Sequence, residues 1–458
     1  MAERDLTVDW EADYSSKLST PEEAAASFRS GDHLWLPPAH ASPPILEALA
    51  ARRDELHEVE VRGVIVPDVG WYQESFMDAF QIAPQFGTAY DRDAVNAKIA
   101  DYHPYWLVGI HKALDAGRDA GEAWAVDKVQ ICVSPPNAQG WVNCGGNVWD
   151  AVTTARRATT VIAEINDRVI EAEGEGWLHV SELDFAVPVD RDPLPARPEE
   201  PPDPDDEGIT HYVSQLVHNG DTIQIGVGSH TQSIVERGGL DDKEDLSYFG
   251  ELTVKGCVPL AERGVFTGRF SALHPGEFTA TVIGNTHEER AHIVGNPVYQ
   301  MRNVEYLLDP TVIARNENFV AINGALRIDL SGQIGVHTIG PRVVAGVGGH
   351  LAFALGAYLC PTGRYICVMP STGLGGTVSN IVPRFEEGQI VTVPREISDT
   401  VVTEFGIARL LGKTVRQRAE ELISVAHPDF RAELRKAMKS FYYPSGYQPE
   451  AANERGRK

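Results

Sequence analysis

Two glycine-rich loops and one carboxylate in an apolar run are the parts of this sequence that could do chemistry. The loops read Gly226-Val227-Gly228-Ser229-His230 and Gly346-Val347-Gly348-Gly349-His350. Each is predicted to lie between a strand and a helix. Glycines in such a loop let backbone N–H groups approach a ligand, and the start of the following helix favours an anion. The pattern predicts a site for a phosphate or a developing oxyanion.

Neither loop matches a more specific phosphate-binding motif. Thr231 stands where a dinucleotide fingerprint needs glycine, and no P-loop pattern occurs in either loop. A tight turn between a strand and a helix is the plainer explanation of either loop alone. Two such loops in the same half of the chain shift the interpretation toward a binding site.

The carboxylate is Glu251, which follows the apolar and aromatic residues 246–250. A carboxylate in such a setting is either buried at a cost or used in chemistry, and a rim carboxylate remains the simpler alternative. Glu404 has a similar setting. His230 and His350 are more typical of hydrogen-bonding wall residues than of bases, and we interpret Cys257 as packing. The sequence has no Gly-x-Ser-x-Gly elbow and no cluster of metal ligands, so we expect no metal.

The elements that must position these residues follow an alternating strand and helix pattern. Strands are predicted at residues 33–36, 59–66, 129–133, 160–165, 222–225, 319–322 and 365–369, and helices at 45–51, 231–237, 416–425 and 430–440. Gly31-Asp32 and Gly220-Asp221 open similar strand–loop–helix units, a weak repeat separated by 189 residues. The pattern predicts an α/β fold with parallel sheets.

Composition limits the range of functions. The 458 residues include 40 basic and 65 acidic side chains, and a charge of 40 − 65 = −25 disfavours nucleic acid and anionic membranes as partners. The five cysteines form no CxxC pair, which favours a reducing cytoplasm. The uncharged stretch 343–360 contains four glycines, so we interpret it as protein core and not as a membrane span.

A compositional boundary divides the chain. Residues 188–207 hold seven prolines and eight acids, too little apolar surface for a fold of their own, and a helix is not expected there. We therefore predict an N-terminal α/β domain at residues 1–190, a linker at 191–207, and a C-terminal α/β domain at 208–458 that carries Glu251.

Several longer segments resemble the acetyl-CoA hydrolase/transferase family, a branch of the class I CoA-transferases. The resemblance covers residues 30–440, and its most specific segments are residues 309–314, 369–372, 402–408 and 426–431. It implies two similar open α/β domains of the CoA-transferase (NagB/RpiA-like) type with the active site between them. It also implies coenzyme A as co-substrate, a small carboxylic acid as partner, and a homo-oligomer.

The resemblance assigns roles by position. Glu251 matches the glutamate that carries CoA as a glutamyl thioester, and an ordinary glutamate, with a pKa near ~4.3, is already an anion at pH 7. Glu404 matches a family motif without an assigned catalytic role. The positions that match CoA-contacting residues are Gly226, Val227, Gly228, Ser229, His230, Asn323, Gly346, Val347, Gly348 and Gly349.

The chain departs from the family pattern at two places, directly before Glu251 and directly after the second glycine loop. Phe249-Gly250 replace a histidine and a small hydroxyl residue, and His350-Leu351-Ala352-Phe353 replace Gln and Asp-Phe. We expect Phe249, Gly250 and His350 to face the acyl pocket and to favour a more apolar acyl group. CoA transfer through Glu251 is the leading function. Acyl-CoA hydrolysis, a non-catalytic acyl-CoA binder, and recruitment to another biosynthetic acyl transfer are the alternatives.

Overall fold

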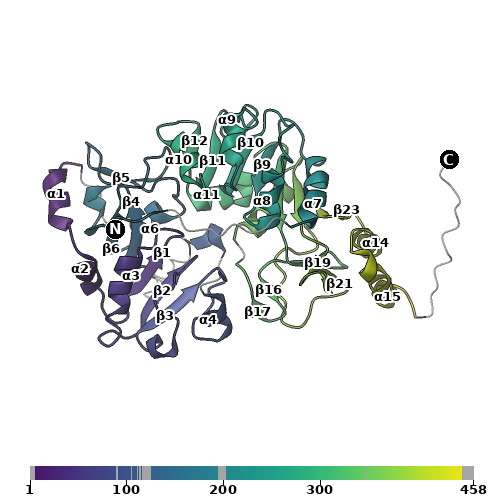
Figure 1. Ribbon diagram of the computed structural model, residues 1–458, viewed down its shortest axis with the longest axis horizontal. Coiled ribbons are helices and arrows are strands. Elements are labelled where there is room, and N and C mark those ends of the chain that lie inside the picture. Colours follow the sequence, from purple (N-terminus) through teal and green to yellow (C-terminus); the bar gives the residue numbers. More distant parts are fainter. Residues whose placement is uncertain are drawn as a thin grey trace.

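The computed structural model describes residues 6–88, 91–104, 106–110, 112, 115, 125–193, 203–346 and 348–445. Two largely parallel β-sheets lie side by side, each flanked by helices (Figure 1). We call residues 6–193 the N-terminal lobe and residues 203–445 the C-terminal lobe. The prediction of an α/β protein with two parallel-sheet domains is confirmed.

The N-terminal sheet has six strands in the order β3-β2-β1-β4-β6-β8, and every neighbouring pair is parallel. Its strands are β1 (His33–Leu36), β2 (Val59–Gly63), β3 (Phe80–Pro84), β4 (Lys128–Val133), β6 (Thr160–Ile165) and β8 (Phe185–Pro188). The other elements of this lobe are α1 (Trp10–Lys17), α2 (Pro21–Ala26), α3 (Pro43–Ala50), η1 (Glu74–Phe76), α4 (Arg92–Asn96), η2 (Leu107–Gly109), β5 (Trp141–Asn143), α6 (Ala151–Ala155), β7 (Trp177–His179) and η3 (Val180–Glu182).

The C-terminal sheet has eight strands in the order β12-β11-β10-β9-β13-β18-β22-β23, of which β23 alone is antiparallel to its neighbour. The strands are β9 (Thr222–Ile225), β10 (Ser247–Leu252), β11 (Phe278–Val282), β12 (Tyr299–Met301), β13 (Phe319–Gly324), β18 (Arg364–Val368), β22 (Thr400–Thr403) and β23 (Gly406–Arg409). Its helices are α7 (Asp205–Ser214), α8 (Ser229–Glu236), α9 (Cys257–Glu262), α10 (His287–Ile293), α11 (Val304–Leu308), α12 (Pro310–Ile313), α13 (His350–Leu359), α14 (Val415–Ser424), η4 (Pro428–Phe430) and α15 (Arg431–Tyr442). Short strands form a side structure: β14 (Arg327–Asp329), β15 (Ile334–Gly335), β16 (Thr338–Ile339), β17 (Arg342–Val343), β19 (Thr372–Gly373), β20 (Val378–Ser379) and β21 (Ile381–Val382).

The weak repeat in the sequence corresponds to a shared topology. Six strands of the second sheet, β11-β10-β9-β13-β18-β22, follow the same order as the six strands of the first. In both sheets the order of strands reverses beside the first strand, between β1 and β4 and between β9 and β13. In open α/β sheets ligands bind outside the carboxyl ends of the strands at such a reversal. The first glycine loop, at residues 226–230, directly follows β9 and therefore lies at that position.

Apolar side chains cover both faces of the C-terminal sheet. Phe249, Phe319 and Phe353 belong to the core on one face, while Tyr248 and Ile322 belong to the core on the other. Strands of parallel sheets are buried on both sides, which explains why these segments read as continuous apolar runs. The carboxylate of Glu251 is therefore set into a strand that is otherwise apolar.

Backbone hydrogen bonds join the two lobes along β11 and α11. Val148 N donates to Thr281 O at 3.0 Å, Ile283 N to Gly146 O at 2.9 Å, and Val304 N to Trp149 O at 3.1 Å. Because main-chain groups make these contacts, the joint depends little on which side chains are present. It fixes the N-terminal lobe against the strands that flank Glu251.

One expectation about the linker is wrong: a helix begins inside it. Helix α7 starts at Asp205, so its first three residues belong to the predicted linker. Acids in the first turn of a helix are favourable, and Asp206 is buried, where it accepts a hydrogen bond from Ser233 Oγ at 2.6 Å and pairs with His230 Nδ1 at 2.7 Å. The domain limits themselves stay a prediction, and residues 194–202 of the linker lie outside the described part of the chain.

The uncharged stretch 343–360 is mostly helix α13, which is ten residues long. Within the described ranges no helix is long and apolar enough to cross a membrane. All five cysteines are buried free thiols.

We predict that Asp206→Ala destabilises the C-terminal lobe by about 2–3 kcal/mol, because it leaves the buried Ser233 hydroxyl and the partly buried His230 imidazole without their acceptor. Thermal unfolding monitored by calorimetry checks this. Glu207→Ala, at the exposed neighbouring position, serves as the control and is expected to change the transition little. Equal stability of both variants would contradict the anchoring role of Asp206.

Candidate active site

Glu251 lies near the carboxyl end of β10, with β9 on one side and β11 on the other. Only 7% of the residue is exposed. The register that pairs Gly250 with Ala280 and Leu252 with Val282 places Thr281 opposite Glu251. The Thr281 hydroxyl is buried and has no hydrogen-bond partner within the described residues. A buried carboxylate next to an unused hydroxyl marks this end of β10 as a polar site inside an apolar sheet.

The second glycine loop covers the carboxylate. The backbone N–H of Gly349, the residue before helix α13, donates a hydrogen bond to Glu251. A Cβ at position 349 would overlap Oε2 of Glu251 and would also come within 3 Å of side-chain atoms of Leu308 and Phe353. Only glycine leaves room for the carboxylate to reach this N–H group. The second glycine loop and Glu251, the candidate nucleophile, are therefore sterically complementary at Gly349.

Burial changes the protonation of Glu251. Loss of hydration raises the pKa of Glu251 from 4.5 to about 7, and the hydrogen bond from Gly349 opposes that rise. Glu251 in the ligand-free protein therefore holds its proton more tightly than the ordinary glutamate from which ionisation at pH 7 was expected. The reason is the apolar surrounding, which the spacing of residues in the sequence did not reveal.

The first glycine loop lies against an amide pair at the reversal of strand order. Asn323 Nδ2 donates to Gln224 Oε1 at 2.8 Å, and Gln224 Nε2 donates to Asn323 Oδ1 at 3.2 Å. A Cβ at Gly226 would lie 2.5 Å from Asn323 Oδ1, so the glycine lets the loop pass close to this pair. The structure thus brings Gly226 and Asn323 together as the resemblance implies. Gln224, on the neighbouring strand, was missed by the sequence analysis.

The remaining positions of this loop differ in exposure. Val227 is 53% exposed, Gly228 has extended backbone, and Ser229 begins helix α8. His230 is held by the Asp206 carboxylate, so its imidazole anchors α7 to α8. The assignment of these residues to CoA binding stays a prediction. The contact agrees with the interpretation of His230 as a hydrogen-bonding residue and not a base.

The N-terminal lobe contributes Phe86 to the second loop. Cβ atoms at Gly346 and Gly348 would meet the Phe86 ring at 2.5 Å and 3.0 Å, so both glycines allow the loop to lie directly on it. Val347 lies outside the described residues. Phe86 follows β3 by two residues, and the rule that ligand sites gather at the carboxyl ends of strands could have pointed to it.

The residues assigned to the acyl pocket pack behind Glu251. The Phe249 ring is buried between His274 and Phe319, with ring centroids 6.2 Å and 6.4 Å away. His350 Nε2 lies 2.6 Å from the Tyr365 hydroxyl, and burial, with a smaller effect of His337, lowers the pKa of His350 to about 3. Gly250 faces Tyr248 and Gln224. Their part in acyl selection stays a prediction.

Two other candidates from the sequence are part of the packing. Glu404 accepts hydrogen bonds from the backbone N–H of Ser371 at 2.9 Å and from its hydroxyl, which joins the loops after β22 and β18. Cys257 is fully buried, and burial raises the pKa of its thiol above the ordinary value. The interpretation of Cys257 as packing agrees with this position.

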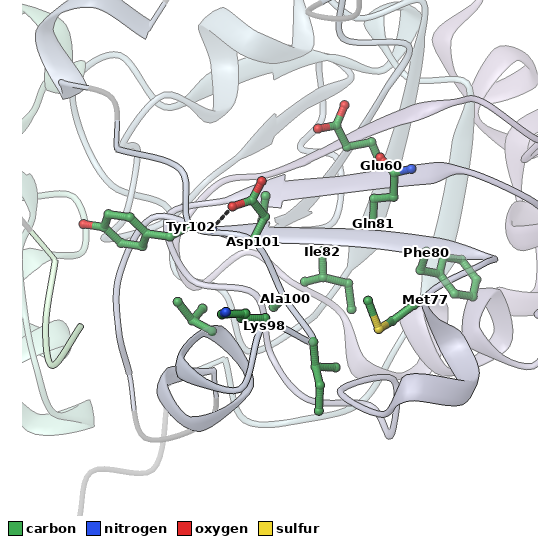
Figure 2. A pocket seen from close by; sticks show the side chains of 12 residues that line it. Glu60, Met77, Phe80, Gln81, Ile82, Lys98, Ala100, Asp101 and Tyr102 are labelled. Atoms are coloured by element: carbon green, nitrogen blue, oxygen red, sulfur yellow. Dashed lines mark hydrogen bonds between the residues drawn. The ribbon is translucent and has the colours of Figure 1, made fainter. Parts of the chain in front are cut away.

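A separate pocket lies in the N-terminal lobe. Figure 2 shows it beside strand β3, with Ile82 and Phe80 from the strand, Met77 before it, and Lys98 and Asp101 from the segment after α4. Its lining includes none of the residues predicted for CoA or acyl binding. Across the residues that the structure describes, no group of three or more His, Cys, Asp or Glu side chains could hold a metal ion.

These features define a two-lobed α/β enzyme with one buried carboxylate at a sheet end, a backbone N–H group on that carboxylate, and glycine loops around it. The N-terminal model of the acetyl-CoA hydrolase/transferase family matches residues 1–196, and its C-terminal model matches residues 290–438. The chain belongs to this family and is an enzyme of the CoA-transferase class.

Relatives cover almost the whole chain. It is 32% identical to the 4-hydroxybutyrate coenzyme A transferase of Clostridium kluyveri, over 94% of this chain and 99% of that protein. It is 34% identical to the succinyl-CoA:cyclohexane-1-carboxylate CoA transferase of Geobacter metallireducens, over 94% and 97%. The crystal structure of RipA from Yersinia pestis matches with a TM-score of 0.87 at 32% identity, over 94% of this chain and 99% of RipA.

We predict that Gly349→Ala lowers the turnover rate by about 100-fold or more, because the new methyl group displaces the Glu251 carboxylate from its N–H donor. Steady-state kinetics with an acyl-CoA checks this. Gly109→Ala is the control, since a Cβ there meets no atom within 4 Å. Activity of Gly349→Ala within a few-fold of the wild type would contradict the fit between loop and carboxylate.

We also predict that Glu251→Gln stabilises the protein at alkaline pH. The pKa of Glu251 is higher in the folded state, so the folded state holds the proton more tightly, and wild-type stability falls as pH rises from 4.5 to about 7. The full loss corresponds to about 3 kcal/mol. Thermal midpoints at pH 8 and pH 5 measure it: the variant should exceed the wild type at pH 8, with a smaller difference at pH 5. A pH-independent difference would contradict the raised pKa.

Proposed function

We propose that the protein transfers CoA between an acyl-CoA and a carboxylic acid through a covalent glutamyl-CoA thioester on Glu251. The observation that carries this proposal is the buried Glu251 carboxylate with the Gly349 N–H group directed at it. A backbone N–H at the start of a helix also stabilises an oxyanion. The Gly349 N–H group can therefore donate a hydrogen bond first to the Glu251 carboxylate and later to the oxyanion that forms when the Glu251 carbonyl carbon is attacked.

The proposed reaction needs no net proton transfer. A carboxylate oxygen of Glu251 attacks the thioester carbonyl carbon, the C–S bond breaks, and CoA leaves as a thiolate from the mixed anhydride. The thiolate then attacks the Glu251 carbonyl carbon, the anhydride C–O bond breaks, and the first acid leaves as its carboxylate. An acceptor carboxylate reverses both steps and regenerates ionised Glu251. In each step one anion enters and one leaves.

Exclusion of water supports transfer over hydrolysis. Glu251 is 7% exposed, and Gly349 closes over it between Leu308 and Phe353. The mixed anhydride formed at this position meets the thiolate, and the thioester that follows meets the acceptor carboxylate, while water has little access. Hydrolysis of the same intermediates remains the second candidate, distinguished by whether free CoA is released without an acceptor.

The acceptor is a small carboxylic acid in this proposal. Relatives act on 4-hydroxybutyrate and cyclohexane-1-carboxylate according to their names. The Phe249 ring behind the nucleophile and the neutral His350 support an apolar acyl group. The glycine loops with Asn323 are proposed to hold CoA, whose negative phosphates need backbone N–H groups in a chain of charge −25. A cytoplasmic location is proposed on the basis of the free thiols, and a homo-oligomer from the resemblance.

We predict that acyl-CoA labels Glu251. The protein is incubated with a panel of acyl-CoAs, reduced with borohydride to convert the thioester to an alcohol, and analysed by peptide mass spectrometry. The modified peptide should contain Glu251, and Glu251→Gln should show neither label nor CoA transfer. Glu288→Gln, an exposed glutamate on α10, is the control and should behave as the wild type. Undiminished transfer by Glu251→Gln would rule out the glutamyl mechanism.

The rate should also depend on pH. Because only ionised Glu251 attacks and its pKa is raised to about 7, kcat/KM should rise with pH up to about 7 and then level off. Below that midpoint it should fall about ten-fold for each pH unit. Rate profiles between pH 5.5 and 8.5 with one acyl-CoA test this, and a flat profile across that range would contradict it.

A further inference from the structure

The second glycine loop is held by a side chain from the opposite lobe. Asn96, the last residue of helix α4, donates from Nδ2 to Val343 O at 2.8 Å and accepts at Oδ1 from Val343 N at 3.1 Å. An amide that pairs with both backbone groups of one residue fixes its position and its orientation. Figure 1 shows α4 beside the β16–β17 hairpin, of which Val343 is the last residue.

Only five residues separate Val343 from Gly349. The first two of them are also held, because Val344 N and Ala345 N donate to His337 O at 2.9 Å and 3.2 Å. Beyond them Gly346 and Gly348 lie on the Phe86 ring. Contacts with Asn96, with His337 O and with the Phe86 ring therefore hold the backbone between Val343 and the Gly349 N–H group that meets Glu251.

Further contacts keep Asn96 itself in place. Its Nδ2 also donates to Arg92 O at 2.8 Å, and Arg92 donates from Nε and Nη2 to Gly87 O at 3.3 Å and 3.2 Å. A Cβ at Gly87 would lie 3.1 Å from the Val343 side chain and 3.2 Å from Ala345 N, so the strand-end loop and the hairpin are in close contact. Helix α4 is thus tied at one side to the loop that carries Phe86 and at the other to the hairpin.

We propose that Asn96 is a positioning residue: from the N-terminal lobe it sets the glycine loop at residues 346–349 so that the Gly349 N–H group meets Glu251. The inference rests on the proposed role of Glu251 as nucleophile and adds that the reaction geometry depends on a hydrogen-bond pair between the lobes. Asn96 touches no reacting atom. It acts through the backbone of Val343.

The test compares Asn96→Ala with Lys98→Ala. Lys98 lies two residues along the same segment, is exposed, and lines the pocket of Figure 2. Asn96→Ala should lower kcat by about 10- to 100-fold, because a small displacement of a reacting group or donor has an effect of that size. Any rise in its KM for acyl-CoA should be smaller than the fall in kcat, since this variant displaces the second glycine loop but leaves the first glycine loop and the Gln224–Asn323 pair in place. Lys98→Ala should match the wild type in both parameters.

Two readouts separate positioning from a general loss of structure. If the Gly349 donor moves away, nothing opposes the effect of burial, so the midpoint of the kcat/KM profile should move to higher pH in Asn96→Ala. Hydrogen exchange followed by mass spectrometry should become faster in peptides that cover residues 343–349, starting with the Val343 amide. An unchanged rate profile and kcat within two-fold of the wild type would overturn the proposal. So would a lower kcat with an unchanged pH midpoint.

A second variant keeps the test decisive if Asn96→Ala fails to fold. Asn96→Asp has the same shape but places a carboxylate oxygen against Val343 O and Arg92 O, where no proton is available. It should show the same fall in kcat and the same upward shift of the pH midpoint, and wild-type behaviour would overturn the proposal. If the proposed function is wrong, the result is different, because Glu251→Gln would then retain CoA transfer. Faster hydrogen exchange at residues 343–349 in the Asn96 variants would in that case still show that Asn96 holds this segment.

Discussion

The hydrogen bond from the Gly349 N–H group to the buried Glu251 carboxylate is the interaction on which the rest of the site depends. Burial makes the carboxylate expensive to ionise, and this single donor is what opposes that cost. It requires glycine at position 349, because a side chain would occupy the space of the carboxylate. It also requires the second glycine loop to lie close enough to Glu251 for this contact. In our proposal the Phe86 ring and the hydrogen bonds between Asn96 and Val343, both from the other lobe, set that position.

The two lobes thus have different tasks in one site. The C-terminal sheet supplies Glu251, the proposed nucleophile, together with the amide pair of Gln224 and Asn323 and the first glycine loop at its reversal of strand order. The N-terminal lobe supplies the support on which the second loop rests. Backbone hydrogen bonds along β11 and α11 hold the lobes at a fixed separation. Burying the Glu251 carboxylate lowers the free energy of unfolding, and such a loss of stability is common where a buried group is needed for activity.

Much of this could be predicted from local sequence, and the part that could not has a common cause. Strand β9 with its glycine loop, and the helix that follows the second glycine loop, are encoded by neighbouring residues, so periodicity and loop composition indicated them; β10 was seen only as an apolar run before Glu251. Asn96 and Gln224 act through partners that are far away in the chain, and no local pattern marks them. The turn of α7 inside the linker was missed for the same reason, since Asp206 is stabilised by residues more than twenty positions later. The raised pKa of Glu251 depends on burial, which only the assembled core creates.

The most direct measurement is the pKa of Glu251 itself in the ligand-free protein. Carbon-13 NMR of protein labelled at the glutamate carboxyl carbon, with the signal assigned by its absence in Glu251→Gln, gives this value without any assumption about the reaction. A titration midpoint near 7 is the predicted result, because a carboxylate closed off by Gly349, Leu308 and Phe353 has lost most of its hydration. A midpoint at the ordinary value of 4.5 would show that the carboxylate is hydrated, and would contradict the account of a buried nucleophile held by one backbone donor.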